Sequence, residues 1–132
     1  MREISLQTKK DHALFYPRAW VYARSRNRNR LAAQKLDAIQ EAQQQGLKVV
    51  GSSDDLCGRH GFVRPGLFAL VRAVCSREVD VVVVSRLSRL SVNRQWLVWL
   101  LRVFHKHNVT VITTECDLRY DLYRHGLDGV LS

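Results

Sequence analysis

The sequence predicts an α/β fold, built as a three-layer open and mainly parallel sheet with helices on both faces. Short apolar runs rich in branched and aromatic residues alternate with longer segments whose apolar residues recur at helical spacing. One run, residues 81–84, consists of four valines and is apolar on both faces, as a central parallel strand is. The chain has 132 residues, of which 46% are hydrophobic, enough for one domain with its own core.

Two strands and one helix are expected in the first half of the chain. Residues 19–23, AWVYA, are typical of a buried strand, and residues 31–45 have the apolar spacing of a helix that Gly46 ends. A second strand is expected at residues 47–50. The glycine-rich stretch that follows, residues 51–66, is predicted to be a loop.

The second half continues the alternation. A helix is expected at residues 67–76, just after Pro65, because proline is common at the first position of a helix. A strand at 79–84, a helix at 92–107 and a strand at 109–113 follow. In a parallel sheet with right-handed crossovers the carboxyl ends of the strands share one edge, where such sheets bind their ligands.

Composition favours a polyanionic partner. Lys and Arg outnumber Asp and Glu by 21 to 12, which gives a net charge of +9, and arginine dominates. Its planar guanidinium suits phosphate, so nucleic acid is the first candidate. The three cysteines lack C-x-x-C spacing, which favours a reducing cytoplasm over a disulfide framework or a zinc site. No membrane contact is expected, since no apolar run is long enough to span a bilayer. No metal or small-molecule cofactor is expected either.

Charged residues follow three predicted strands at the points where they end. They are residues 24–30 (RSRNRNR), Asp54, Asp55, Arg64, Arg86 and Arg89. Taken singly, a charged run is commonly a solvated loop, and aspartates commonly form turns. At one sheet edge, however, guanidinium groups and the Ser25 hydroxyl suit attack on a phosphodiester, because guanidinium groups stabilise the charge that develops at phosphorus. Arg86 and Arg89, three residues apart, are expected on one side of a helical turn.

Five short motifs occur in the order and at the spacing of a known family. They are YAR at 22–24, LAAQ at 31–34, DDLCG at 54–58, RPGL at 64–67 and VDVVVVSRLSRL at 79–90. From about residue 19 to residue 115 the chain resembles the catalytic domain of the serine recombinases, the resolvase and invertase family. The resemblance implies a resolvase-like fold, with the catalytic domain over residues 19–132. The polar residues of mixed charge that precede it are expected to form an N-terminal arm over residues 1–18.

The same resemblance implies site-specific DNA recombination. Strands are cut and rejoined without a metal ion, through a phosphoserine bond to a DNA 5′ end, and exchange takes place within a tetramer. DNA and further copies of the chain, as a dimer or tetramer, are therefore the implied partners. The implied catalytic residues are Ser25, Arg24, Asp54, Arg64, Arg86 and Arg89, and the predicted DNA-binding residues are Arg26, Arg28 and Arg30.

The chain departs from the family pattern at two places. The family has Arg, any residue, then Ser after the first strand, whereas here Ser25 directly follows Arg24 and Arg26 stands at the serine position. Because this loop is one residue shorter, a deletion can still make Ser25 the equivalent residue, although a shift of one residue points a strand side chain to the other face. The family also usually has Asp where this chain has Ser85.

The helix expected at residues 92–107 has two apolar stripes. The first comprises Leu97, Leu100, Leu101 and Phe104, and the second comprises Trp96, Trp99 and Val103. The first stripe should pack on the sheet. The second is either a subunit interface, which the resemblance favours, or a surface buried within the same chain.

The end of the chain also bears on the prediction. After Glu115 the family continues with a long dimerisation helix and commonly with a separate DNA-binding domain. Only residues 116–132 follow here, so that helix is expected to be truncated and that domain to be absent.

Two functions are consistent with these features, and a third is weaker. The first is a recombinase catalytic domain that cuts and rejoins DNA. The second is a catalytically degenerate relative that binds DNA or a partner recombinase and regulates it. The third, a nucleotide- or phosphate-binding α/β module, is disfavoured because neither G-x-G-x-x-G nor G-K-[ST] occurs.

Overall fold

The structure, a computed structural model, describes residues 16–58, 61, 63–127 and 129. Its elements are β1 (Arg18–Ser25), α1 (Arg28–Gln44), β2 (Lys48–Leu56), α2 (Pro65–Cys75), β3 (Val81–Val84), the 3₁₀ turn η2 (Leu87–Arg89), α3 (Arg94–Lys106), β4 (Thr110–Thr113) and α4 (Leu118–Arg124). An N-terminal arm was expected over residues 1–18. Residues 1–15 lie outside the described residues, and Arg18 already belongs to β1.

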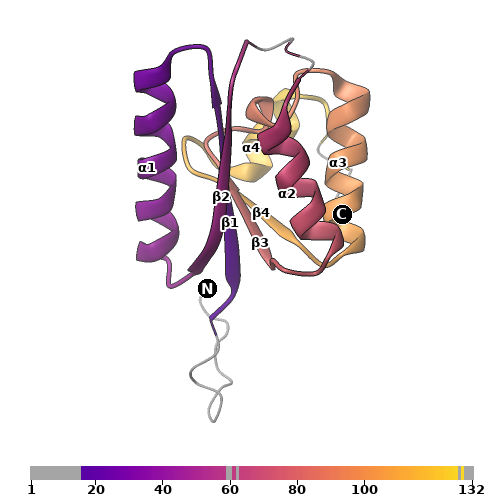
Figure 1. The fold of residues 1–132 in the computed structure, drawn as a ribbon. Helices are drawn as coiled ribbons and strands as arrows, with labels where there is room; N and C mark the ends of the chain where they lie inside the picture. Colours follow the sequence, from indigo (N-terminus) through magenta and orange to yellow (C-terminus); the bar gives the residue numbers. More distant parts are fainter. Residues whose placement is uncertain (1–15, 59–60, 62, 128, 130–132) are drawn as a thin grey trace.

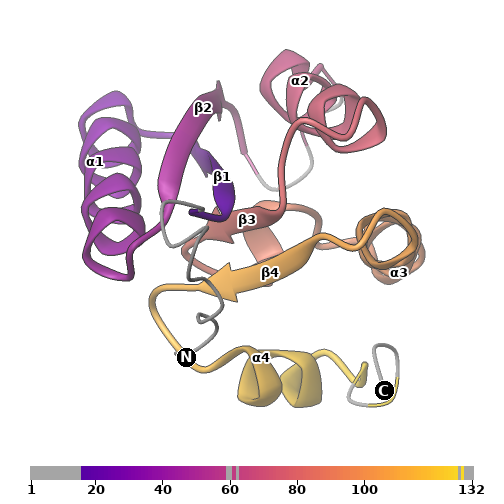
Figure 2. The same ribbon diagram turned by 90° about the horizontal axis from the view of Figure 1, so that it is seen from below.

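The strands form one parallel sheet in the order β2-β1-β3-β4. Helix α1 covers one face, α2 and α3 cover the other, and α4 lies beside the edge strand β4 (Figures 1 and 2). The predicted three-layer α/β fold is thereby confirmed. Because all three pairs of neighbouring strands are parallel, the carboxyl ends of the strands lie at one edge of the sheet. The segments that follow β1, β2 and β3 meet at that edge.

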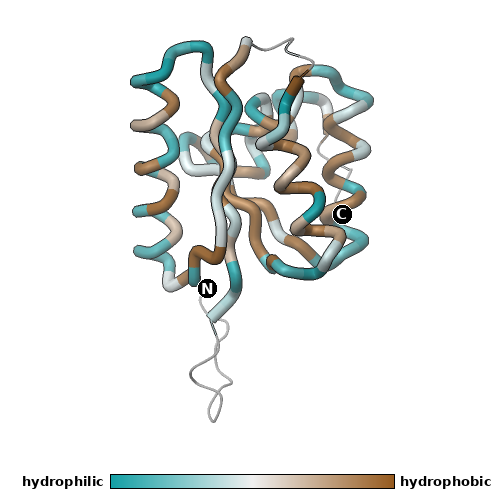
Figure 3. Tube along the Cα trace, viewed as in Figure 1, coloured by the Kyte–Doolittle hydropathy of each residue, from teal (hydrophilic) through white to brown (hydrophobic). Residues whose placement is uncertain are grey.

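Two apolar clusters hold the layers together, one on each face of the sheet. Figure 3 shows the apolar stretches of the helices and the central strands. The four valines of β3 are all buried. Because strand side chains alternate between the two faces, two of these valines belong to each cluster. The cluster against α1 contains Ala19, Val21, Ala38, Ala42, Val81 and Val83, and the larger cluster includes Tyr22, Leu70, Val82, Val84, Leu97, Leu101 and Phe104. The first predicted stripe of α3 therefore packs on the sheet.

Strand β2 is longer than predicted. Residues 51–56 were expected to begin a loop because glycine, serine and aspartate are poor strand formers, yet they pair with β1 as far as Ser25 opposite Leu56. Gly51 provides room for the Trp20 ring, and the Trp20 indole N–H donates to the Ser53 hydroxyl at 3.0 Å. Tertiary pairing thus overrides local propensity here.

The helix boundaries follow from polar caps. The Asn27 side chain accepts a hydrogen bond from the Arg30 N–H at 2.9 Å, so α1 begins three residues before the predicted start. Asn93 caps α3 in the same way, through the Trp96 N–H at 3.0 Å. Helix α4 was not predicted. In the described part of the chain, none of the helices has both the length and the apolar character needed to cross a membrane.

The approach of α2 to β2 generates a stability prediction. A Cβ at Gly66 would overlap the backbone of Asp54, so Gly66→Ala should lower the free energy of unfolding by about 2 kcal/mol. Gly58→Ala is the matched control, because the nearest described atoms to its Cβ would belong to the Arg26 side chain, at 3.5 Å, and we expect a change below about 0.5 kcal/mol. Urea titration measures both. Equal losses would contradict this packing.

Candidate DNA-phosphate site

Two arginines, one at the end of strand β1 and one before helix α2, converge on the backbone that follows β3. Arg24, at the end of β1 and only 3% exposed, donates from Nε to the Arg89 carbonyl at 3.2 Å and from Nη2 to the Ser88 carbonyl at 3.1 Å. Arg64, which precedes α2, donates from Nη1 to the Leu90 carbonyl at 2.7 Å and from Nη2 to the Arg89 carbonyl. The carbonyls of residues 88–90 therefore hold both guanidinium groups at one place.

The cluster is strongly positive. The pKa of Arg24 lies below its ordinary value, first because burial disfavours the charged form and then because Arg64 and Arg89 are close enough to repel it. The Arg64 Nε is buried without a hydrogen-bond partner among the described residues and lies 3.9 Å from an Asp55 carboxylate oxygen. A site with three guanidinium groups near one buried carboxylate favours a bound anion.

Asp55 and Tyr22 form the polar floor of this cluster. The Tyr22 hydroxyl donates to Asp55 Oδ2 at 2.6 Å and accepts from Arg64 Nη2 at 2.7 Å. Burial, followed by the bond to Asp55, raises the pKa of Tyr22, so the phenol stays protonated and keeps donating. Asp55 also accepts the backbone N–H groups of Gly66 at 2.7 Å and Leu67 at 2.9 Å, which fixes the start of α2.

Asp54, the predicted catalytic carboxylate, lies on the other face of β2. Its Oδ2 pairs with Lys35 Nζ of α1 at 2.8 Å. The structure therefore brings Asp55, and not Asp54, to the arginine cluster. Sequence analysis placed Asp55 among the charged residues of the sheet edge but gave the catalytic role to Asp54, as the resemblance implied, and it gave Tyr22 no role. With β2 expected to end at residue 50, strand alternation could not distinguish the two aspartates. A longer strand would have put alternate residues on one face and set Asp55 beside Tyr22.

Ser25, the predicted nucleophile, follows Arg24 at the last position of β1. Its hydroxyl accepts a hydrogen bond from the Asn27 N–H at 3.2 Å, and no hydrogen bond between described residues joins it to an arginine. Strand alternation puts neighbouring side chains on opposite faces, so Ser25 and Arg24 diverge. The Arg26 side chain lies next to Gly58, in the glycine-rich loop that follows β2.

Arg86 and Arg89 have different partners. Arg86 precedes η2 in an extended conformation, with φ −150° and ψ 158°, and its Nε pairs with Glu115 at 2.6 Å. Arg89 Nε donates to the Ser85 hydroxyl at 3.2 Å. The expected shared face of a helical turn is therefore not formed. Arg89 adjoins Arg24 and Arg64, whereas Arg86 is held by an exposed ion pair, a type of contact that is weak in water.

The remaining predicted residues lie at the surface. Arg26, Arg28 and Arg30 are exposed at the start of α1, and their role in DNA binding stays a prediction. Trp96 and Trp99 are 61% and 49% exposed and meet edge to face, with ring centroids 5.9 Å apart. Val103 packs instead against the core.

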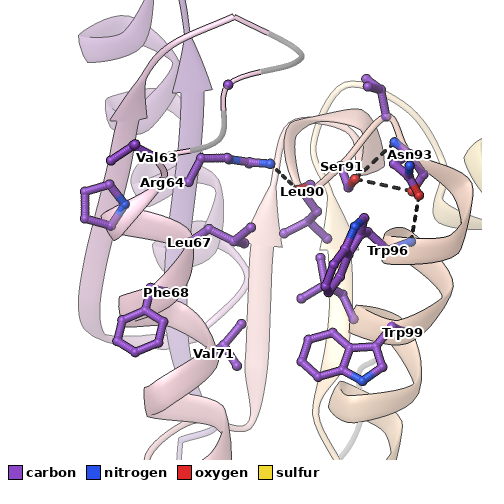
Figure 4. Close-up of a pocket in the computed structure, with 14 residues that line it drawn as sticks. Val63, Arg64, Leu67, Phe68, Val71, Leu90, Ser91, Asn93, Trp96 and Trp99 are labelled. Atoms are coloured by element: carbon purple, nitrogen blue, oxygen red, sulfur yellow. Dashed lines mark hydrogen bonds between the residues drawn. The ribbon is translucent and has the colours of Figure 1, made fainter.

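An apolar groove of about 790 Å³ runs between α2 and α3 beside the arginine cluster. Figure 4 shows Phe68 and Val71 of α2 on one side, Trp96 and Trp99 of α3 on the other, and Arg64 reaching Leu90 at the upper end. Two residues of the second predicted stripe of α3, Trp96 and Trp99, therefore border an open surface of this chain.

The two neighbouring aspartates provide a matched test of the cluster. Asp55→Asn should lower the free energy of unfolding by about 2–3 kcal/mol, because it leaves buried donors facing an amide. Asp54→Asn, which loses a half-exposed ion pair, should cost about 0.5 kcal/mol. Urea titration of the two variants decides the point. A loss for Asp54→Asn as large as for Asp55→Asn would contradict the assignment of Asp55 to the buried network.

Comparisons with known proteins agree with the observed fold. The structure is similar to that of the C-terminal catalytic domain of ISC1926 TnpA, an IS607-like serine recombinase, with 26% identity and a TM-score of 0.68 over 81% of this chain and 75% of that one. A resolvase family site-specific recombinase from Streptococcus pneumoniae has 20% identity and a TM-score of 0.67, over 87% and 85% of the two chains.

A third solved structure, the first open reading frame in transposon ISC1904 from Sulfolobus solfataricus P2, has 20% identity and a TM-score of 0.64, over 75% of this chain and 68% of that one. No curated protein matches the sequence. The family model described as the resolvase N-terminal domain, however, matches residues 19–126. By that match over most of its length, the chain belongs to the resolvase family.

Proposed function

We propose that this domain is the catalytic domain of a site-specific DNA recombinase, which cuts and rejoins DNA through a phosphoserine intermediate. The observation that carries the proposal is the convergence of Arg24, Arg64 and Arg89 at the carboxyl edge of the sheet in a member of the resolvase family. A net charge of +9 supports a DNA substrate, which in turn favours the cytoplasm as the place of the reaction.

The proposed reaction is a transesterification. The Ser25 oxygen bonds to phosphorus while its proton leaves to a base, and the bond from phosphorus to the DNA 3′ oxygen breaks, with a proton returning to that oxygen. The DNA 5′ phosphate is then attached to the protein, and the reverse reaction on another 3′ hydroxyl rejoins the strands. The arginine cluster stabilises the negative charge at phosphorus.

This reaction requires two local rearrangements of the described structure. The turn after β1 has to release the Ser25 hydroxyl from the Asn27 N–H and direct it toward the face that Arg24 occupies. Arg86 has to exchange Glu115 for the phosphate, which costs little because exposed ion pairs contribute about 0–1 kcal/mol. Arg26, Arg28 and Arg30 then bind the DNA backbone.

The proposal includes assembly with further copies of the chain. Trp96 and Trp99 are exposed beside the groove, and aromatic side chains of this kind are enriched where protein surfaces meet. Val103, packed against the core, supports α3 beneath them. A dimer or tetramer would bring more than one arginine cluster to the DNA.

A second function is favoured by the orientation of Ser25. Its hydroxyl is bonded to the Asn27 N–H, and the Arg24 guanidinium is bonded to backbone carbonyls. Ser85 stands where the family usually has a carboxylate. A domain that keeps the arginine cluster without a directed nucleophile would bind DNA or a partner recombinase and regulate recombination without cleaving.

Covalent capture separates the two functions. The protein is incubated with a mixture of nicked, end-labelled duplexes of random sequence, which trap a phosphoserine adduct because the short cut strand diffuses away. The wild-type protein and Ser76→Ala, an exposed serine after α2, should form the adduct, and Ser25→Ala should form none. An adduct that survives in Ser25→Ala would refute this nucleophile. Salt-sensitive binding without any adduct would support the regulatory function.

The exposed arginines at the start of α1 are tested by the salt dependence of binding. Each phosphate contact contributes about 0.9 to the slope of log K against log salt concentration. Replacing Arg26, Arg28 and Arg30 by alanine should therefore reduce the slope by about 2–3 in a fluorescence anisotropy titration of a labelled duplex.

The control for this titration replaces Lys48, Arg72 and Arg77, which are also exposed and remove the same total charge. It should leave the slope within about 1 of wild type, because these residues lie away from the strand ends that form the site. An equal drop in both triple variants would mean that net charge alone governs binding.

A further inference from the structure

Helix α4 carries a carboxylate into the interior. Asp121 is 0% exposed, and its Oδ2 accepts the backbone N–H of Leu87 at 2.7 Å. Leu87 is the first residue of η2, 34 positions earlier in the chain. Burying a carboxylate is costly unless it is hydrogen-bonded, so this contact accounts for a charged side chain at this place. The other oxygen lies 3.7 Å from Arg124 Nη1 and 3.7 Å from His125 Nε2.

The turn that receives this contact has no cap of its own. Arg86, at the position before η2, makes no side-chain cap, and the Ser85 hydroxyl accepts from Arg89. An aspartate in place of Ser85 would be well placed to accept the N–H two residues further on, which is the Leu87 N–H. The chain lacks that local carboxylate, and a distant helix supplies one to the same donor.

The η2 turn in turn holds the arginine cluster. Arg24 and Arg64 donate to the carbonyls of residues 88–90, directly after the residue that Asp121 anchors. Leu87 is fully buried in the same apolar cluster as Leu122 of α4, so the turn and the helix also share their packing. A displacement of α4 would therefore move the acceptors to which both guanidinium groups are bonded.

We propose that Asp121 is a positioning residue, which sets the η2 turn and through it places Arg24, Arg64 and Arg89 for a DNA phosphate. The phosphate part of this inference rests on the proposed function, whereas the coupling between Asp121 and the arginines does not. Helix α4 thereby links the C-terminal end of the described fold to the site. Its carboxylate takes over the role that an aspartate at position 85 would have.

The test uses variants that separate these contributions. Asp121→Ala removes the acceptor, and Asp121→Ala combined with Ser85→Asp returns a carboxylate to the turn from its local position. Asp37→Ala, an exposed aspartate of α1, changes the net charge by the same amount. NMR spectroscopy measures hydrogen exchange of the Leu87 amide and the Arg24 Nε–H signal, and anisotropy measures affinity for a labelled duplex.

We expect Asp121→Ala to speed exchange of the Leu87 amide, shift the Arg24 Nε–H signal and weaken DNA binding about tenfold. The double variant should return all three toward wild type, and Asp37→Ala should change none. Faster exchange at Leu87 with an unchanged Arg24 signal, or no rescue by Ser85→Asp, would overturn the positioning role. If the NMR changes appear but the wild-type protein binds no DNA, the coupling stands and the proposed function fails.

Should Asp121→Ala not fold, Asp121→Asn carries the test, since it keeps the shape and one weaker acceptor oxygen. Smaller changes of both NMR signals in the same direction would support the proposal. A change at Leu87 alone would overturn it.

Discussion

The structure of the site depends on one short stretch of backbone. The carbonyl oxygens of residues 88–90 accept hydrogen bonds from Arg24, at the end of β1, and Arg64, before α2, which are far apart in the chain. Guanidinium groups repel one another, so they gather only where acceptors hold them. Here the acceptors are neutral carbonyls, which fix the geometry without cancelling the charge. The cluster therefore keeps its attraction for an anion.

The surrounding network gives this backbone its position from several sides. Asp55 of β2 accepts hydrogen bonds from Tyr22 and from the first backbone N–H groups of α2, the helix that Arg64 directly precedes. From α4, Asp121 holds the first N–H of the turn. Both carboxylates are buried and both accept backbone N–H groups, so they order the site. Asp55, whose carboxylate oxygen lies 3.9 Å from Arg64 Nε, offsets part of the charge of that guanidinium group, and one carboxylate still faces three guanidinium groups. The valines of β3 anchor the start of the turn between the two apolar clusters.

Much of the fold followed from periodicity, and the failures have identifiable causes. The four valines of β3 and the apolar stripe of α3 are strong local signals, and both elements occur where they were expected. The prediction for β2 ended too early, at residue 50, because the second half of this strand is stabilised by pairing with β1. No local sequence pattern reveals that pairing. A strand that ended at residue 50 could not separate the face of Asp54, whose partner is Lys35, from that of Asp55, so the role implied by the resemblance stayed with Asp54. Asp121 was missed because its acceptor role depends on a contact across 34 residues.

The resemblance to the resolvase family correctly indicated the fold, and the geometry adds what short motifs omit. A motif indicates which arginines are present, but not that Arg86 pairs with Glu115 while Arg24 is buried. It also does not say which face of β1 a serine occupies after a shift of one residue. These are properties of side-chain direction and tertiary contact, and they separate a cleaving domain from one that only binds.

The central claim, that the cluster of Arg24, Arg64 and Arg89 accepts a DNA backbone phosphate, is tested most directly by observing the guanidinium groups during a titration. The side-chain Nε–H signals of the protein are followed by NMR as a short duplex is added at low salt. The account predicts that the signals of Arg64 and Arg89 shift together with duplex concentration and return when salt is raised, while that of Arg102, exposed on α3, stays in place. If only the signals of the arginines at the start of α1 shift, the cluster stabilises the fold without binding phosphate, and the claim is wrong.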